Sequence, residues 1–285
     1  MAGPPPYSRI VIGWEDDERG EDAAALGEML ARTAGDELRR VHIDRGPPGR
    51  ALRELAERGE ADLIVLGSTH RAALGSVAPG SVAEHLLSGS PCRIAIAPRG
   101  YARAEAMLRA EQAGEEAADV PADFPLPLVR AEPRVVAVGF NDTPESRAAL
   151  DEAVTLARAA PAAMWLIGVT EPIPQMPPGT ASASAGPPPA VSAGHPPTRT
   201  LEERLMEVAA ELPPELRALP VHERGDPVER LVDRSGEGVD LLVLGSRGFG
   251  PVMRVLLGSV SARVIRRAPC PVMIVPRPEY ERLHD

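Results

Sequence analysis

The stretch VDLLVLGS, from Val239 to Ser246, occurs a second time as ADLIVLGS, from Ala61 to Ser68. The offset of 178 positions continues without a gap to Arg99 and Arg277. Over the aligned stretch 15 residues are identical, and each copy carries one Gly-Ser-Val and one Pro-Cys. An internal repeat of this length indicates that one structural module occurs twice in the chain.

The two repeats differ in length. Residues 9–13 correspond to residues 135–139 at an offset of only 126, so repeat two holds 52 additional residues before its Asp-Leu segment. The stretch Val41 to Gly46 reads most like Val221 to Gly225, which we expect to be the third strand of repeat two. We therefore expect repeat one to lack the second strand and the second helix.

Short apolar runs alternate with helical patterns in both repeats, which is typical of βαβ units with parallel strands. Thr143 suits the N-cap of a helix, because its hydroxyl can accept a backbone N–H and Pro144 follows in the first turn. The predicted fold class is α/β, with two Rossmann-like open parallel sheets in tandem and repeat one shortened. For repeat two the sequence predicts strands at 134–140, 164–169, 218–223, 240–245 and 272–275, and helices at 144–159, 200–211, 227–235 and 259–267.

Two segments of unusual composition interrupt these patterns. Residues 171–199 are rich in Pro, Gly, Ala and Ser, so we expect a mobile loop there. The segment between the repeats is expected to be partly helical from Ala102 to Ala118 and extended from Pro121 to Pro133. The predicted organisation is a shortened repeat at 1–100, a linker at 101–133 and a full repeat at 134–285.

The composition excludes several classes of function. The net charge is −10, and all 31 basic residues are arginines. A DNA-binding surface needs an excess of basic residues, and a chain without lysine has neither a phosphate-loop lysine nor a Schiff-base lysine. No secretion signal and no apolar run of membrane-spanning length stands out. We expect a cytoplasmic protein with no nucleic-acid or membrane partner.

Cys92 and Cys270 follow proline at equivalent places in the two repeats. We expect both thiols to be reduced and partly buried, because cytosolic thiols usually stay reduced. The histidines are scattered singly, and no Cys/His cluster has metal-ligand spacing, so the sequence predicts no metal site and no catalytic constellation.

The strongest functional signal is a set of glycines in repeat two. Gly245-Ser246-Arg247-Gly248 is followed, after nine residues, by Gly258-Ser259. The first glycine ends a predicted strand, at the edge where open α/β sheets bind ligands, and the last opens a predicted helix with its free N–H groups. Such an arrangement suits a phosphate chain held by main-chain amides. The alternative is that the glycines serve only as turn and cap residues.

This pattern, G-x2-G-x9-G-[S/T], resembles that of the ATP-binding members of the universal stress protein family. The opening of repeat two, Val138 to Ser146, resembles the first loop of that family, and the resemblance covers residues 9–99 and 134–277. It implies a five-stranded parallel sheet in the order 3-2-1-4-5. It also implies an intramolecular pseudo-dimer, in which the two repeats dock through their last strands, with a homodimer as a further possibility.

The resemblance implies a ligand as well. That ligand is ATP, with or without Mg²⁺, and AMP and ADP are alternatives. Val169 would line the adenine pocket, and Asn141 stands at the position of the family's adenine-contacting acid. No catalytic residue is implied. The implied nucleotide-binding residues are Gly139, Asn141, Val169, Leu244, Gly245, Arg247, Gly248, Gly258, Ser259 and Val260.

Repeat one departs from the pattern. His70 stands where the second glycine belongs, although Gly80 and Ser81 follow at the expected distance, and Glu15 takes the place of the first-loop acid. A side chain at His70 would occupy space that a close phosphate needs. Because the strand that would wall the purine is also expected to be missing, we predict about one adenine nucleotide per chain, bound in repeat two.

Three classes of function compete. The resemblance favours an ATP-binding stress sensor or regulator that has no defined reaction. An adenylyl-transferring enzyme would need an HIGH-type motif or an S-G-G-x-D-S loop, and the sequence contains neither. The third class is a ligand-free tandem scaffold for partner binding, and a slow ATPase is a variant of the first.

Overall fold

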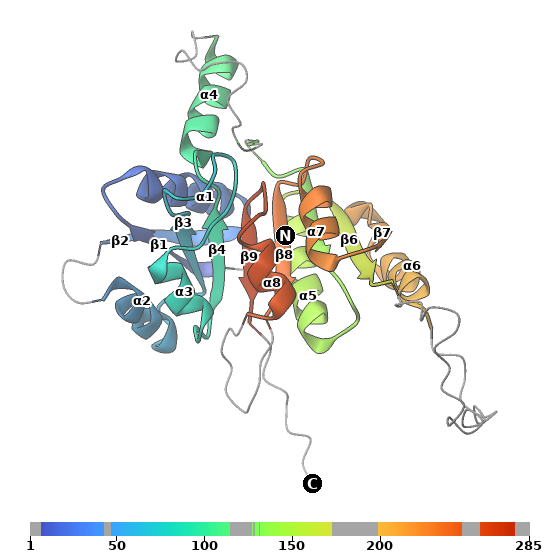
Figure 1. The fold of residues 1–285 in the computed structure, drawn as a ribbon. Helices are drawn as coiled ribbons and strands as arrows, with labels where there is room; N and C mark the ends of the chain where they lie inside the picture. Colours follow the sequence, from blue (N-terminus) through green and yellow to red (C-terminus); the bar gives the residue numbers. More distant parts are fainter. Residues whose placement is uncertain are drawn as a thin grey trace, which may run out of the picture.

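The computed structural model describes residues 7–42, 47–114, 127, 129–130, 132–172, 199–246 and 257–276. These residues form one nine-stranded sheet with helices on both faces (Figure 1). The strands lie in the order β2-β1-β3-β4-β9-β8-β5-β6-β7, and every neighbouring pair is parallel except β4 and β9. The predicted α/β fold class is confirmed.

Repeat two has the strand order β7-β6-β5-β8-β9, which is the predicted order 3-2-1-4-5. Two helices and the last strand have the predicted bounds, whereas the last helix ends earlier than predicted, at Val264. The loop expected at 171–199 falls almost wholly outside the described residues. The elements are β5 (Val135–Gly139), α5 (Pro144–Ala159), β6 (Ala163–Thr170), α6 (Leu201–Glu211), β7 (Leu219–Arg224), α7 (Pro227–Ser235), β8 (Leu241–Gly245), α8 (Ser259–Val264) and β9 (Val272–Val275).

Repeat one is shorter, as predicted, but its second strand takes a different place from the one expected. β2 runs parallel to β1 and pairs with it over its whole length, in the place that β6 takes beside β5. We expected repeat one to lack the strand beside β1 that would form a wall of the cavity, and this expectation is wrong. The open edge of β1 needs a hydrogen-bonding partner, and the strand that follows α1 fills it. The elements are β1 (Tyr7–Trp14), α1 (Glu18–Ala34), β2 (Gly35–His42), α2 (Pro48–Glu57), β3 (Leu63–Gly67), α3 (Ser81–Leu87) and β4 (Arg93–Ala97).

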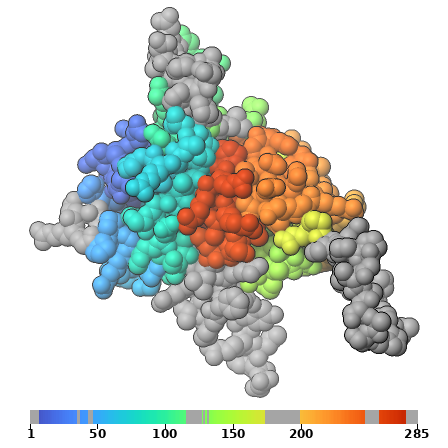
Figure 2. Space-filling view, viewed as in Figure 1, coloured from blue at the N-terminus to red at the C-terminus, as the bar shows by residue number. Residues whose placement is uncertain are grey.

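The two repeats join through their last strands. Ala95 of β4 lies opposite Met273 of β9, in an antiparallel pairing that also includes Ile94 and Ile96. This is the docking through the last strands that the family resemblance implies, and it makes the two parallel sheets one continuous sheet. In the space-filling view the C-terminal part of repeat two, residues 257–276 in red, lies directly against repeat one (Figure 2).

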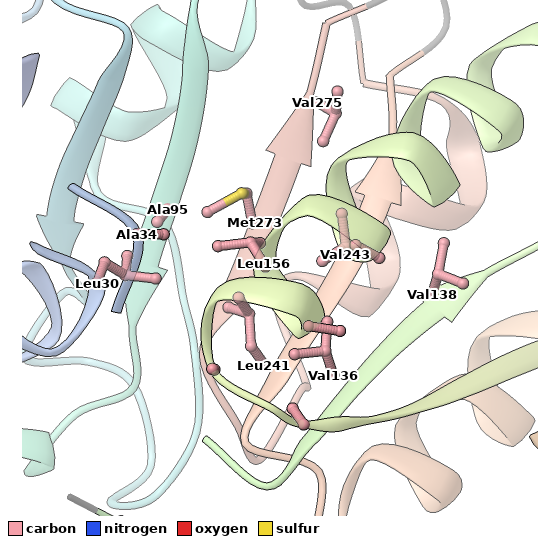
Figure 3. Close-up of a cluster of buried hydrophobic side chains, with 14 of the residues drawn as sticks. Leu30, Ala34, Ala95, Val136, Val138, Leu156, Leu241, Val243, Met273 and Val275 are labelled. Atoms are coloured by element: carbon pink, nitrogen blue, oxygen red, sulfur yellow. The ribbon is translucent and has the colours of Figure 1, made fainter. Parts of the chain in front are cut away.

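The hydrophobic core is continuous across this junction. One face of the sheet is covered by α1, α5 and α6, and the other by α2, α3, α7 and α8. Met273 lies between Ala95 of repeat one and Leu156 of repeat two (Figure 3). Within the described ranges, no helix combines the length and the apolar character needed to cross a bilayer.

A buried polar cluster also links the repeats. Glu152 on α5 is only 5% exposed, and it accepts hydrogen bonds from the Tyr7 hydroxyl and, at 2.7 Å, from Nε of Arg93. Burial raises the pKa of Tyr7, and the charge of Glu152 raises it further, so Tyr7 is a neutral donor. The guanidinium of Arg93 lies over the Tyr7 ring, 5.7 Å from its centroid. Arg93 is therefore the charge that balances Glu152.

We expect the substitution Arg93→Leu to lower the free energy of unfolding by about 3 kcal/mol, because it leaves Glu152 as a buried charge without its cation. The matched control is Arg266→Leu. Arg266 also bridges the repeats, through Glu84 at 2.9 Å, but both side chains are at least half exposed, so a loss of at most about 1 kcal/mol is expected. Denaturant titration measures the free energy of unfolding of both variants. Equal losses in the two variants would contradict this account.

The linker begins with a helix, α4 (Tyr101–Ala113), which starts one residue before the range predicted to be partly helical and ends five residues before the end of that range. Asp22 of α1 holds its start, since the carboxylate accepts the N–H groups of Gly100 and Ala102, each at 2.9 Å. Further along, Arg32 donates to the buried carboxylate of Glu105. The expected extended stretch from Pro121 to Pro133 falls mostly outside the described residues.

Asp22 should make stability depend on pH. Burial raises its pKa from 3.8 to about 6, and the nearby Glu18 and Glu21 add to the shift, which the two backbone hydrogen bonds oppose. A carboxyl whose pKa is higher in the folded state stabilises the fold below its unfolded pKa, and this stability is lost as the pH rises through the folded pKa. The free energy of unfolding of the wild type, minus that of Asp22→Asn, should therefore fall between about pH 4 and pH 7. Denaturant titrations at intervals in this range test it, and a difference that rises with pH would contradict it.

Both cysteines are free and buried. Burial raises the pKa of Cys92 to about 11 and that of Cys270 to about 12, so both are neutral thiols at physiological pH. The prediction of two unpaired thiols agrees with the structure, although they are more completely buried than expected.

Candidate functional site

A cavity lies at the carboxyl ends of the strands of repeat two. Its volume is about 580 Å³, which is within the range of small-molecule pockets. β5, β6 and β8 end at this cavity and α8 begins there, which is the edge where open α/β sheets bind ligands. The lining residues are Gly139, Phe140, Asn141, Thr143, Glu145, Ser146, Ile167, Val169, Glu171, Pro227, Leu231, Leu244, Gly245, Gly258, Val260 and Ser261.

Most of the residues predicted from the family pattern meet in this cavity. Ser259 is not among the lining residues, and Arg247 and Gly248 lie outside the described residues. The others come from segments that are far apart in the sequence, so only the fold brings them together. They are Gly139, Asn141, Val169, Leu244, Gly245, Gly258 and Val260. What each of them binds stays a prediction.

Several lining residues were missed from the sequence. Ile167 precedes Val169 by two positions on β6, so strand alternation places both side chains on one face and could have identified it. Leu231 reaches the cavity from α7, and no local pattern marks it. The two acids Glu145 and Glu171 were also missed, although Glu145 lies in the first turn of α5 and Glu171 directly follows β6.

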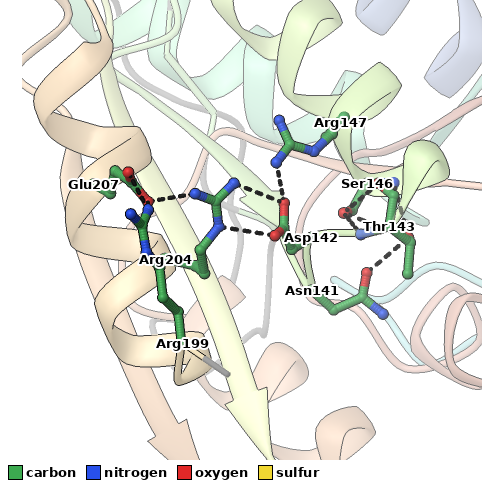
Figure 4. A network of polar contacts seen from close by, with 8 residues as sticks. All are labelled: Asn141, Asp142, Thr143, Ser146, Arg147, Arg199, Arg204 and Glu207. Atoms are coloured by element: carbon green, nitrogen blue, oxygen red, sulfur yellow. Dashed lines mark hydrogen bonds and ion pairs between the residues drawn. The ribbon is translucent and has the colours of Figure 1, made fainter. Parts of the chain in front are cut away.

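The loop after β5 is held in place by ion pairs. Asp142 adopts a φ of 60°, in the left-handed region, and its carboxylate contacts Arg147 and, at 2.9 Å, Nε of Arg204. Partial burial works to raise the pKa of Asp142, but Arg204 and Arg147 outweigh it and lower the pKa below its usual value. Arg204 also pairs with Glu207, so the network ties the loop to α6 (Figure 4).

On either side of Asp142, polar side chains line the cavity. The N–H of Ser146 donates to Oγ1 of Thr143 at 3.3 Å, and the N–H of Thr143 donates to Oγ of Ser146 at 3.0 Å. This reciprocal capping box confirms the predicted N-cap of α5. Thr143 also donates its hydroxyl hydrogen to Oδ1 of Asn141, at 2.9 Å.

The charged side chains that line the cavity are of one sign. Among its described lining residues, the charged side chains are Glu145 and Glu171, both acidic. Within the described ranges, no group of three or more His, Cys, Asp or Glu side chains could hold a metal ion.

Repeat one has a smaller cavity at the equivalent edge, of about 290 Å³. Val41 and His42 of β2 form part of its wall, where repeat two uses β6. Arg19 lies in this cavity and pairs with Glu15 and, through Nε at 2.7 Å, with Asp17. An internal ion pair thus occupies the region that corresponds to Asn141. His70 is exposed and is not a lining residue.

The comparison with known proteins follows the division into two repeats. The model of the universal stress protein family matches residues 3–98 and 133–276, which together make up most of the chain. The chain belongs to the universal stress protein family. Because the two matched segments correspond to the two repeats, it is a tandem member.

Individual relatives match over shorter stretches. A universal stress protein of Thermus aquaticus is 45% identical over 53 residues, which cover 18% of this chain and 39% of that protein. One of Mycobacterium tuberculosis is 49% identical over 49 residues, 17% of this chain and 16% of that protein. The chain therefore spans well under half of the length of these relatives. Among solved structures, a universal stress protein from Archaeoglobus fulgidus has a TM-score of 0.51 at 21% identity, covering 84% of this chain and 70% of that one, and this likeness shows the fold alone.

Two glycines of the universal stress pattern have a packing role that needs no ligand. A Cβ at Gly245 would lie 2.3 Å from the carbonyl oxygen of Glu145, and one at Gly67, the equivalent in repeat one, 2.1 Å from that of Arg19. In each repeat the first turn of a helix touches the end of the strand. Gly139 similarly leaves room for Leu244, whose Cδ2 lies 2.7 Å from a Cβ built there.

We expect Gly245→Ala to lower the free energy of unfolding by about 2 kcal/mol without any nucleotide, because the backbone of α5 must shift to admit the methyl group. Gly80→Ala is the matched control. Gly80 has a φ of −84°, and the nearest atom to an added Cβ is 4.0 Å away, so its stability should change by no more than about 0.5 kcal/mol. Denaturant titration of the two variants separates them. Similar stabilities would show that Gly245 is not required for packing.

Proposed function

We propose that repeat two binds one adenine nucleotide, ATP, in the cavity at the ends of β5, β6 and β8, and that the protein acts as a stress sensor or regulator without a defined reaction. The observation that carries the proposal is the cavity itself. Its volume suits a nucleotide, and seven of the residues in the family's nucleotide-binding pattern line it.

The two ends of the cavity suit different parts of a nucleotide. Ile167 and Val169 give the β6 side an apolar wall, and Asn141 adds a hydrogen-bonding group, which suits an uncharged base. The other side is formed by Gly245 and Gly258, and Gly258, at the N-cap of α8, carries no side chain that would cover the backbone there. We infer that the phosphates lie on this second side, with Arg247 as the cation contributed by the sequence.

Binding is proposed for repeat two alone. The repeat-one cavity has about half the volume, and the Arg19–Glu15 pair provides each charge with an internal partner. A ligand there would have to break that pair. The reasons expected from the sequence were a missing strand and His70, but β2 supplies a wall in repeat one and His70 does not line its cavity. A ligand-free scaffold remains the alternative function.

The equivalent valines Val260 and Val82, in the first turns of α8 and α3, provide a matched test. ATP at about 100 times its dissociation constant should raise the free energy of unfolding of the wild type by about 2.7 kcal/mol. Val260→Trp should abolish this gain, because an indole at the cavity wall takes the space of the ligand. Val82→Trp should leave the gain unchanged.

Titration calorimetry then counts the sites, and we expect one per chain. Two equivalent sites, or a gain that survives Val260→Trp and is lost in Val82→Trp, would place the nucleotide elsewhere. Absence of any ATP binding by the wild type would favour the scaffold.

A further inference from the structure

The junction between the repeats is symmetric in its strand pairing but not in its side chains. Ala95 and Met273 stand at equivalent positions, at the offset of 178, and they lie directly opposite each other in the pairing of β4 with β9. Leu30 and Leu156, equivalent at the offset of 126, belong to the same core cluster (Figure 3). A small and a large residue therefore meet at the centre of the junction, and only a pairing of unlike repeats brings them together.

The buried polar cluster at the junction is asymmetric as well. Repeat one contributes Tyr7 and Arg93, whereas repeat two contributes Glu152 and Met273. The fully buried hydroxyl of Tyr7 donates to Glu152 and lies 3.6 Å from Sδ of Met273. Arg93 donates through Nε to the same carboxylate, at 2.7 Å. Every one of these polar contacts thus joins one repeat to the other.

The equivalent positions of the opposite repeat hold only apolar residues. The offsets of 126 and 178 relate Tyr7, Arg93 and Glu152 to, in that order, Pro133, Pro271 and Leu26. All three of these residues are buried. The side chains of proline and leucine neither donate nor accept hydrogen bonds. The polar cluster can therefore form only where repeat one meets repeat two.

Two copies of repeat one would fit each other poorly through this surface. Tyr7 and Arg93 would meet Leu26 in place of the carboxylate. Among the described residues, the partners of the Tyr7 hydroxyl both come from repeat two, so this buried group would lose them both, which is unfavourable. Two copies of Ala95 opposite each other would also leave a void.

Two copies of repeat two would fit no better. Glu152 is only 5% exposed, and it would meet prolines in place of the hydroxyl and the guanidinium. A buried carboxylate without a donor or a cation is strongly destabilising. Two copies of Met273 would in addition compete for the space at the centre of the junction, which one methionine and one alanine now share.

We propose that this junction is a recognition surface for unlike repeats, on which each repeat accepts the other and rejects a second copy of itself. The discrimination comes from groups that are left unpaired, or side chains that no longer fit, in the wrong pairing. A second copy of this chain can therefore use the surface only by exchange, with repeat one of one chain bound to repeat two of the other. The inference does not depend on the nucleotide.

The test presents repeat one with its own residue inside the full chain. Glu152→Leu places at the junction the residue that a second copy of repeat one would bring. We expect the melting temperature to fall by about 10 °C, because Tyr7 and Arg93 lose their buried acceptor. Asp151→Ala is the matched control. It also introduces the repeat-one residue, Ala25, and removes a carboxylate from α5, but Asp151 is exposed, so a change of at most about 2 °C is expected.

Two rescues separate the choice of partner from a general loss of packing. Adding Tyr7→Phe and Arg93→Leu to Glu152→Leu removes the groups that the leucine leaves unpaired, so most of the lost melting temperature should return. Ala95→Met and Met273→Ala should each lower the melting temperature, the first by overpacking and the second by a cavity. Together they exchange the residues of the two repeats, so about half or more of the summed loss should be recovered.

Thermal denaturation of the full chain measures all of these variants. The inference is overturned if Glu152→Leu melts like Asp151→Ala, since repeat one would then accept its own residue. It is also overturned if the triple variant melts no higher than Glu152→Leu, or if the exchange of Ala95 and Met273 recovers nothing. Should Glu152→Leu fail to fold, the return of folding in the triple variant provides the same test.

Discussion

The hydrogen bonds between β4 and β9 join the two repeats into one sheet, and the surrounding packing follows from that junction. Each repeat alone would end in an exposed strand with unpaired backbone groups, and the antiparallel pairing removes both edges at once. It also merges two modest cores into one, with Met273 packed between the repeats. Because the strands of the two repeats run in opposite directions, their carboxyl ends, and hence their cavities, lie at opposite edges of the sheet.

The two repeats of the module have different cavities. In repeat two, five strands and a loop tied to α6 by Asp142 and Arg204 keep a wide cavity at the strand ends. In repeat one, which is shorter by a strand and a helix, β2 pairs with β1, and Arg19 forms ion pairs inside the smaller cavity. The packing positions, such as Gly67 and Gly245, are the same in both repeats, whereas the polar positions of the cavities differ.

The glycines of the family pattern and the polar residues near them therefore have separate roles. Gly139 and Gly245 are required by contacts between a helix, a strand and a leucine side chain, whether or not a ligand binds. The residues that distinguish the repeats chemically are polar ones after the first strand. Repeat two has Asn141 where repeat one has Glu15, and Glu145 where repeat one has Arg19. In this chain, Arg19 and Glu15 pair with each other inside the repeat-one cavity, whereas Asn141 and Glu145 line the larger cavity of repeat two.

The tandem architecture, the strand order of repeat two and most of its element bounds could be predicted from the amino-acid sequence. The tandem architecture follows from the internal repeat and the strand order from the family resemblance, whereas the element bounds follow from local patterns such as the N-cap residue Thr143 and the apolar run of β8. The family pattern likewise identified seven residues that line the larger cavity. The partner of β2, the Arg19–Glu15 pair and the Arg93–Glu152 pair, in contrast, are visible only in the folded chain. Each of these depends on which groups remain unpaired once the chain has folded, and local sequence patterns do not contain that information.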